Sequence, residues 1–149
     1  MDAGVADRDV RLFIFRRFLE AATPPSVEET AHGLDLSVQE ARASYQRLAD
    51  ARMIVFHPGT VDVWMAHPLS AVPTPFLVET GGRSYFANCA WDGPGVLAML
   101  HADGRVATRC PDCGELLDLV IVNGQLASAE SIIHYAVPAR KWWDDIGYA

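Results

Sequence analysis

The apolar residues of this chain change their spacing once, near residue 52, and this change limits the folds that are open to it. Before that point, apolar residues recur every three or four positions, the spacing that gives a helix one buried face. After it, short apolar runs are separated by turn residues such as Gly, Pro and Asn, which is typical of strands. Helices that come first and strands that follow predict an α+β fold.

Three helices are predicted in the N-terminal part, and two of them follow an N-cap serine. Ser26 and Ser37 each precede an amphipathic stretch, where a serine hydroxyl can accept a hydrogen bond from a free backbone N–H. Two strand-like runs, 53–57 and 61–65, come next, with turn residues between them. Three helices and a hairpin in this order predict a winged helix-turn-helix-like domain over residues 1–66.

The charge balance argues against nucleic acid as a partner of this domain. The chain has 12 basic and 19 acidic residues and a formal net charge of −7, and residues 1–66 alone carry seven Arg and ten acids. Affinity for DNA depends on neutralising phosphates, which an acidic surface does poorly. We therefore expect residues 1–66 to serve a structural or oligomerisation role, such as a homodimer contact. A metal-responsive regulator that reads DNA through its third helix is the alternative.

The second half of the chain is predicted to be mostly β. Residues 67–75 contain three prolines and are predicted to be a linker. Residues 76–149 are predicted to form a mixed β-sheet domain with short helices. The run Gly93-Pro94-Gly95 is predicted to break the chain before a short helix at 96–100. The predicted strands are 76–79, 84–86, 105–109, 116–122 and 132–137.

The three cysteines all lie in this second half, at Cys89, Cys110 and Cys113. Three is an odd number and far too few for a disulfide scaffold. The N-terminus is acidic and lacks the apolar core of a secretion signal, and no apolar run is long enough to span a membrane. We therefore expect a cytoplasmic protein whose reduced thiols are free to act as ligands or nucleophiles.

One cysteine is paired with a carboxylate. The segment Cys89-Ala90-Trp91-Asp92 places a thiol and a carboxylate three residues apart at the start of a predicted helix, so both are expected on one face. A helix N-terminus lowers the pKa of a nearby cysteine, and a carboxylate can accept the thiol proton and return it to a leaving group. The alternative is that Cys89 is a small buried residue and Asp92 an acid at a helix start.

The other two cysteines form a Cys-x-x-Cys-Gly knuckle. This spacing points the sulfurs of Cys110 and Cys113 at one soft metal ion such as zinc. Structural zinc needs further ligands, for which Cys89 is the candidate third and His101 or His134 the candidate fourth. A redox pair, or a plain β-turn with two incidental cysteines, is the alternative.

The stretch Tyr85-Phe86-Ala87-Asn88-Cys89-Ala90-Trp91-Asp92 resembles the active-site segment of organomercurial (alkylmercury) lyases, in which an aromatic strand leads into Cys-Ala-x-Asp. Other pieces occur in the same order as in that family. A helix-turn-helix-like part precedes the segment, a second cysteine-bearing turn follows at Cys110, and Val137-Pro138 precedes a short helical piece over 139–146. The resemblance covers about residues 10–149.

This resemblance implies protonolysis of a carbon–mercury bond, with Cys89 binding mercury and Asp92 moving the proton to the leaving carbon. The family uses a second mercury-binding cysteine, and no cysteine follows Cys113 here, so Cys110 or Cys113 is the candidate second sulfur. No cofactor is expected; Hg(II) is the substrate or product metal, and small-molecule thiols are the expected partners. A non-catalytic protein that binds zinc or another soft ion at Cys110 and Cys113 is the alternative.

The other aromatic, histidine and acidic residues of note are predicted to have structural rather than catalytic roles. Trp142 and Trp143 are predicted to be core or interface anchors. His57 and His67 flank the predicted hairpin and are expected to be surface or core histidines. The acidic pair Asp144-Asp145 is expected on a solvated helix face.

Overall fold

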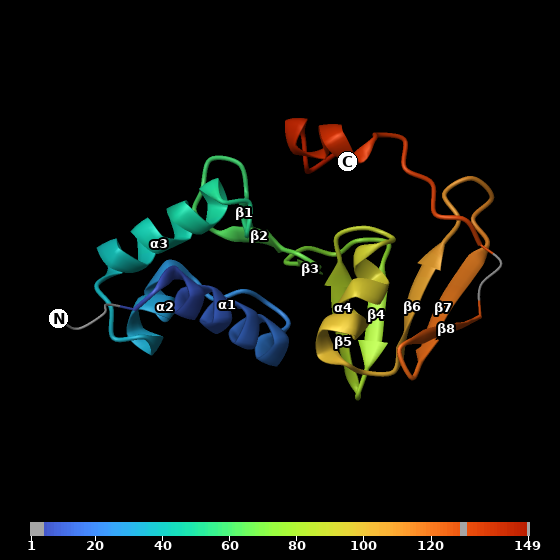
Figure 1. Cartoon of the computed structure of the whole chain (residues 1–149), viewed down its shortest axis with the longest axis horizontal. Coiled ribbons are helices and arrows are strands. Elements are labelled where there is room, and N and C mark those ends of the chain that lie inside the picture. The colour runs from blue at the N-terminus through green and yellow to red at the C-terminus, as the bar shows by residue number, and fades with distance from the viewer. Residues whose placement is uncertain (1–4, 129–130, 149) are drawn as a thin grey trace.

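A computed structural model describes residues 5–128 and 131–148, and within them eight strands form one antiparallel sheet. The strand order is β1-β2-β3-β5-β4-β6-β7-β8. Figure 1 shows the N-terminal helices at one end of the molecule, the β6–β8 strands at the other, and α4 beside β4 and β5 between them. The predicted combination of helices with a sheet is confirmed, but the sheet is antiparallel at every strand pair rather than mixed. Short turns join most of the neighbouring strands, and such turns can connect only antiparallel strands.

Three helices, α1 (Asp7–Ala21), α2 (Val27–Gly33) and α3 (Val38–Asp50), open the chain. Both predicted serine caps are present. Ser26 Oγ accepts a hydrogen bond from the Glu29 N–H at 3.1 Å, and the Glu29 carboxylate accepts one from the Ser26 N–H at 2.8 Å. Ser37 caps α3 in the same reciprocal way. These local contacts satisfy N–H groups that a helix start leaves unpaired.

Five strands form the half of the sheet next to the helices: β1 (Val55–Phe56), β2 (Val63–Ala66), β3 (Leu69–Ser70), β5 (Arg83–Ala87) and β4 (Leu77–Thr80). The predicted linker 67–75 contains β3, which pairs with β2 on one side and β5 on the other. Leu69 and Ser70 are both buried. A strand of two residues is too short to show an alternation of apolar and polar side chains. The prolines around it were the stronger signal, so the linker prediction missed the strand.

The other half of the sheet consists of β6 (Gly104–Arg109), β7 (Leu116–Val122) and β8 (Gln125–Ser128). The Asn123-Gly124 turn joins β7 to β8, and both its residues have positive φ. The predicted strand 132–137 is wrong, because residues 131–135 are extended without ladder partners. β7 pairs with β6 on one side and with β8 on the other, which leaves no free edge beside β7 for another strand.

Helix α4 (Asp92–Leu100) begins earlier than predicted, and Gly93-Pro94-Gly95 forms its first turn instead of a break. Proline is tolerated there because the first N–H groups of a helix have no partner within it. Gly93 allows close packing on the sheet, since a Cβ at this position would lie 2.7 Å from Val106 Cγ1. The helix therefore rests directly on β6.

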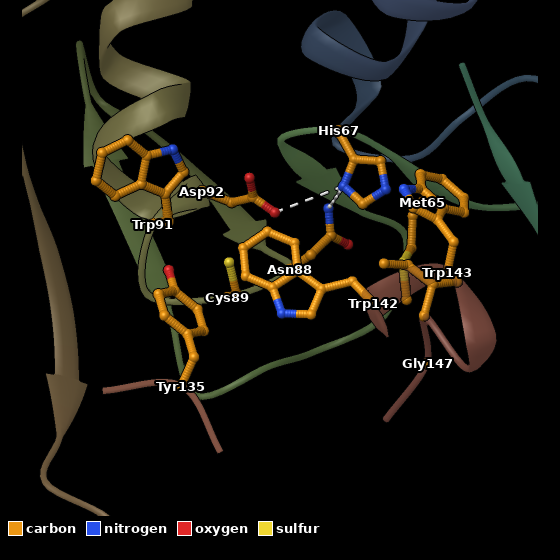
Figure 2. A pocket seen from close by; sticks show the side chains of 11 residues that line it. Met65, His67, Asn88, Cys89, Trp91, Asp92, Tyr135, Trp142, Trp143 and Gly147 are labelled. Atoms are coloured by element: carbon orange, nitrogen blue, oxygen red, sulfur yellow. Dashed lines mark hydrogen bonds and ion pairs between the residues drawn. The ribbon is translucent and has the colours of Figure 1, made fainter. Parts of the chain in front are cut away.

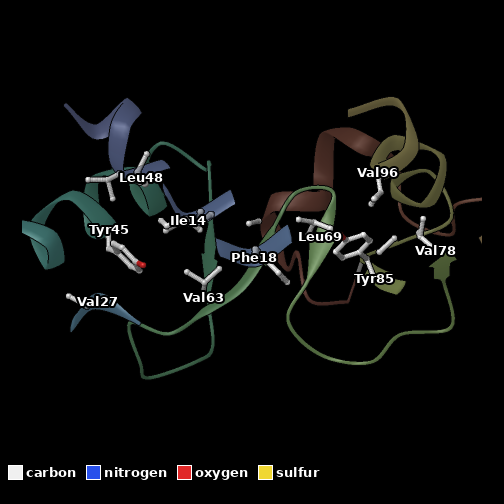
Figure 3. Packing of buried hydrophobic residues seen from close by; sticks show 14 of the residues in the cluster. Ile14, Phe18, Val27, Tyr45, Leu48, Val63, Leu69, Val78, Tyr85 and Val96 are labelled. Carbon is white, nitrogen blue, oxygen red and sulfur yellow. The ribbon is translucent and has the colours of Figure 1, made fainter. Parts of the chain in front are cut away.

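One continuous core connects the helices to the sheet (Figure 3). Ile14 and Phe18 of α1 and Tyr45 of α3 are almost completely buried, and Leu69 and Val78 continue the cluster into the sheet. Tyr45 is the largest of these side chains, and its hydroxyl lies 2.7 Å from Thr30 Oγ1. A buried hydroxyl with a partner avoids the cost of an unsatisfied polar group.

Two side chains of β5 fix the end of α1 on the sheet. The Tyr85 hydroxyl and the Arg83 guanidinium both donate hydrogen bonds to the Leu19 carbonyl, each at 2.9 Å. A helix C-terminus leaves such carbonyls without partners inside the helix. These bonds hold α1 against the strand that leads to Cys89.

The C-terminal segment 131–148 runs back from the β8 end toward β1 and β2 (Figure 1). It includes the short 3₁₀ helix η1 (Ala139–Asp144), as expected after Val137-Pro138. Trp142 Nε1 donates to the Val137 carbonyl at 2.8 Å, and Gly147 packs so closely on Trp64 that a Cβ there would lie 2.5 Å from the ring. In the described part of the chain, no helix has the length and apolarity needed to cross a membrane.

Candidate functional site

Three segments that are distant in the sequence enclose a pocket of about 270 Å³. They are the end of β2 with the residues after it, the turn from β5 into α4, and the C-terminal segment (Figure 2). The wall is mainly apolar and aromatic, with a few polar groups, which is the usual character of a small-molecule site. The lining residues are Met65, His67, Asn88, Cys89, Trp91, Asp92, Tyr135, Trp142, Trp143, Ile146 and Gly147.

Cys89 and Asp92 both line this pocket, from the single turn that joins β5 to α4. The Gly93 N–H donates to the Cys89 carbonyl at 3.2 Å, which holds this turn in a helical shape. Figure 2 shows the sulfur and the carboxylate on the same side of the turn. The spacing in the sequence therefore brings the two groups into one cavity, as expected for residues three apart on a helical turn.

The pKa of the Cys89 thiol is raised, and the expectation of a lowered value is wrong. Burial is the largest cause, because it disfavours the charged thiolate. Backbone hydrogen bonds from Asp92 and Trp91 and a side-chain hydrogen bond from Tyr135 lower the pKa, while the charge of Asp92 raises it. The N–H groups at the helix start are present as predicted, but burial outweighs them.

Tyr135 is a second titratable group beside the thiol. Burial, followed by the charge of Cys89 and the hydrogen bond with it, raises the pKa of Tyr135 to about 12. The ring packs on Trp142, with a centroid distance of 5.1 Å. The tyrosine therefore stays a neutral phenol that can donate a hydrogen bond to the Cys89 sulfur.

The carboxylate of Asp92 faces a histidine that sequence reasoning treated as structural. His67 Nδ1 lies 3.6 Å from Asp92 Oδ2, and Asn88 Nδ2 lies 3.3 Å from the same nitrogen (Figure 2). Asn88 is held in turn by the hydrogen bond that its amide donates to the Leu69 carbonyl at 3.2 Å. The side chain of Asp92 is only 17% exposed. Within residues 5–128 and 131–148, His67 Nε2 and Asn88 Oδ1 are buried without hydrogen-bond partners.

The two tryptophans form part of the pocket wall. The Trp143 ring meets the His67 ring edge-on, with centroids 6.0 Å apart. The Arg52 guanidinium lies 5.0 Å from the centroid of the Trp143 ring. The prediction of core anchors is wrong, since Trp142 is only partly buried, Trp143 is 37% exposed and neither belongs to the hydrophobic core. Both line the cavity beside Cys89 instead.

Cys110 and Cys113 lie in the turn between β6 and β7, and they are not among the residues that line the pocket. Phe86 of β5 and Ala107 of β6 flank the same residue of β4, Leu77. Two strand spacings therefore separate β5 from β6, a distance of about 10 Å. Both strands run antiparallel to β4, so Cys89 and Cys110 follow strand ends at the same edge of the sheet.

The predicted shared site for one metal ion is not assembled. Among the residues that the structure describes, no group of three or more His, Cys, Asp or Glu is placed to hold a metal ion. His101 ends α4 with a positive φ of 50°, and His134 lies exposed in the C-terminal segment. The intervening strand β4 is the physical reason that the knuckle and Cys89 remain separate.

Comparison with known proteins gives a family and a fold. Residues 69–149 match the sequence model of the alkylmercury lyase family, MerB. The crystal structure of the mercury-bound form of MerB2 is similar, with a TM-score of 0.64 and 23% identity, over 81% of this chain and 59% of that chain. The present chain therefore spans about three fifths of the length of that protein. No curated protein matches the chain.

Proposed function

This chain belongs to the alkylmercury lyase family, and we propose that it breaks the carbon–mercury bond of an organomercurial in the pocket that Cys89 and Asp92 share. The observation that carries this proposal is the thiol and the carboxylate, which open from one helical turn into one aromatic cavity. The mercury-bound state of the similar MerB2 structure supports mercury as the ligand. No cofactor is needed, because mercury enters as part of the substrate.

The first step is capture of the substrate by Cys89. The raised pKa keeps the proton on the sulfur in the empty pocket, so capture requires a proton acceptor. The sulfur forms a bond to mercury, the weakly bound ligand of mercury leaves, and the thiol proton passes to the Asp92 carboxylate. The strong preference of soft metals for thiolate drives this exchange.

The second step returns the proton. Asp92, now a carboxylic acid, donates its proton to the carbon bound to mercury, and the electron pair of the carbon–mercury bond forms the new carbon–hydrogen bond. The hydrocarbon leaves, Asp92 is again a carboxylate, and Hg(II) remains on the Cys89 sulfur. A small-molecule thiolate then completes the two-fold coordination of Hg(II). A second thiol displaces the Cys89 sulfur and gives it a proton, so that Hg(II) leaves with two small-molecule thiolates and Cys89 is again a thiol.

His67 is a positioning residue for Asp92 in this scheme. Its ring is held by the edge-on contact with Trp143, and the tautomer with the proton on Nδ1 presents an N–H to the carboxylate from a fixed direction. A carboxylate with a fixed orientation can reach the sulfur and the carbon in turn. The aromatic wall keeps bulk water away, which strengthens every electrostatic interaction in the pocket.

The direct test is release of benzene from a phenylmercury compound in the presence of excess thiol. We expect turnover by the native chain and none by Cys89→Ser. The turnover rate of Asp92→Asn should fall by at least about 100-fold, the rate enhancement that a general acid usually provides. Equal benzene release by the native chain and the Cys89→Ser variant would show that the chain is not a lyase. Mercury binding measured on the same samples separates a loss of capture from a loss of protonation.

We also propose that α1–α3 with the β1–β2 hairpin form a winged-helix-like scaffold that supports the pocket. The hydrogen bonds from Arg83 and Tyr85 to the end of α1 and the shared core support this role. The acidic balance of residues 1–66 disfavours DNA. DNA binding that weakens steeply with added salt would contradict the scaffold role and favour a regulator.

A further inference from the structure

The turn between β6 and β7 carries two cysteines that the proposed reaction does not use. Backbone hydrogen bonds close this turn: the Cys110 N–H donates to the Glu115 carbonyl, and the Gly114 N–H donates to the Cys110 carbonyl, each at 2.9 Å. Gly114 has a φ of +75°, a conformation that other residues rarely adopt. The Arg109 guanidinium donates to the Gly114 carbonyl at 3.2 Å. The sulfurs are therefore mounted on a well-connected hairpin turn.

The two cysteines of this turn stand three residues apart, inside the loop that the Cys110–Glu115 and Gly114–Cys110 backbone hydrogen bonds close. Backbone hydrogen bonds from Cys113 and Asp112, followed by the side-chain hydrogen bond from Cys113, lower the pKa of the Cys110 thiol. Both backbone groups point at the same sulfur, which favours its charged form. Cys113 is exposed and Cys110 is partly exposed, so an ion can reach both from solvent.

The number of ligands indicates which ions fit. In the part of the chain that the structure describes, no third His, Cys, Asp or Glu joins this pair to make a larger metal group. Structural zinc is almost always bound by four ligands, which two sulfurs alone do not supply. Soft ions that bind thiolate strongly and accept two ligands, such as Hg(II) and Cu(I), suit a two-sulfur site.

We propose that Cys110 and Cys113 form a separate, solvent-accessible site that holds one soft ion of the Hg(II) or Cu(I) type between their sulfurs. It is distinct from the pocket, because strand β4 lies between the strands that lead to Cys89 and Cys110. It also differs from a zinc knuckle in needing no further ligand. The site stands whether or not the pocket cleaves organomercurials.

The experiment uses the full chain with Cys89→Ser, which removes the pocket thiol. The reduced protein is titrated with HgCl₂ without oxygen, in the presence of a competing small thiol, and native mass spectrometry counts the ions retained per chain. We expect one Hg(II) per chain in Cys89→Ser and none when Cys110→Ser and Cys113→Ser are added. The absorption of thiolate–mercury bonds should appear and disappear with the same variants.

Three comparisons complete the test. Pro111→Ala changes the turn but keeps both sulfurs, and we expect it to retain the ion in the Cys89→Ser background. Circular dichroism must show that the variants fold alike, and a folded Cys89→Ser chain that retains no more Hg(II) than the triple variant would overturn the proposal. Retention of zinc at one ion per two chains would also overturn it, since that result means a four-sulfur site between two copies.

Discussion

At the scale of single residues, burial decides the chemistry of Cys89. A raised thiol pKa keeps the sulfur protonated until a ligand with strong affinity for thiolate arrives. Non-specific oxidation and alkylation both require the thiolate, so they are slowed at this residue. The neighbouring carboxylate then matters as the acceptor of the proton that mercury displaces. In the proposed reaction, burial and Asp92 together would make the thiol selective for soft electrophiles.

Alkylation kinetics should report this raised pKa. In a chain with Cys110→Ser and Cys113→Ser, the rate of Cys89 alkylation by iodoacetamide should rise with pH around a midpoint above that of an exposed cysteine. Tyr135→Phe removes the phenol hydroxyl, whose interaction with the thiol lowers the Cys89 pKa, so it should move the midpoint higher still. The measurement is the rate against pH by mass spectrometry. A midpoint at or below that of a cysteine-containing peptide would contradict burial as the dominant cause.

His67 should affect turnover through Asp92 rather than through substrate binding. We expect His67→Gln to lower kcat by about tenfold, a part of the usual contribution of general acid catalysis, with little change in KM. The pH dependence of kcat should also change, because His67, Asp92, Cys89 and Tyr135 are the titratable groups that meet in the pocket.

A second histidine provides the matched control. His57 stacks on Trp64 with a centroid distance of 5.7 Å and does not line the pocket, so His57→Gln should leave kcat and its pH profile as in the native chain. If His67→Gln and His57→Gln behave alike, the positioning role is wrong. A common loss of stability would show in their melting temperatures.

At the scale of elements, the carboxylate of Asp7 in α1 connects this helix to α3 through a cluster of hydrogen bonds, here called the clip. Asp7 accepts hydrogen bonds from Arg47 at 2.7 and 2.8 Å and from the Ser44 hydroxyl at 2.6 Å. The hydrogen bonds from Arg47 and then Ser44 lower the pKa of Asp7 to about 2. The clip joins the first turn of α1 to the second half of α3, and it lies far along the chain from the pocket.

The pH dependence of stability follows from this depressed pKa. The clip stabilises the fold above the unfolded-state pKa of Asp, about 3.9, and loses its effect as the pH falls toward 2. Asp7→Asn should lower the free energy of unfolding by less than about 1 kcal/mol, because the pair is exposed. Urea unfolding should give a difference between the two proteins that shrinks between pH 4 and pH 2. A difference that is constant over this range would exclude the ion pair as its cause.

The elements that the sequence predicted well are those with local signals. Ser26 and Ser37 cap helices through contacts three residues away, and the Gly81-Gly82 turn joins β4 to β5 as its residue types indicate. The pairing of Cys89 with Asp92 was predictable for the same reason. The raised pKa of Cys89 was not predictable, since its burial depends on Tyr135 and the rest of the C-terminal segment, which lie far along the chain.

The elements and residues that were missed depend on contacts between distant parts of the chain. Strand β3 has two residues, and only its neighbours β2 and β5 make it a strand. His67 meets Asp92 because β3 brings the end of β2 next to the end of β5. No spacing in the sequence carries that information, so the histidine could be identified only after the sheet order was known.

At the scale of the whole molecule, the pocket is assembled from segments that the sheet brings together. The residues around Met65 come from the hairpin beside the helices, Cys89 comes from the middle of the sheet, and the aromatic wall comes from the C-terminal segment. In the proposed reaction each segment has a different role: His67 would orient Asp92, the turn into α4 would carry the reacting groups, and Trp142 and Trp143 would form the aromatic wall. The site therefore depends on the complete arrangement rather than on one motif.

The two buried residues of β3 connect the N-terminal helices to the pocket through one sheet and one core. Parts that share a core unfold together, so their stabilities are not independent. A ligand that binds only the folded pocket should then lower the population of the open state for amides in α1 and α3 as well, by mass action. We therefore expect occupancy of Cys89 to appear as hydrogen-exchange protection in helices that never touch the ligand.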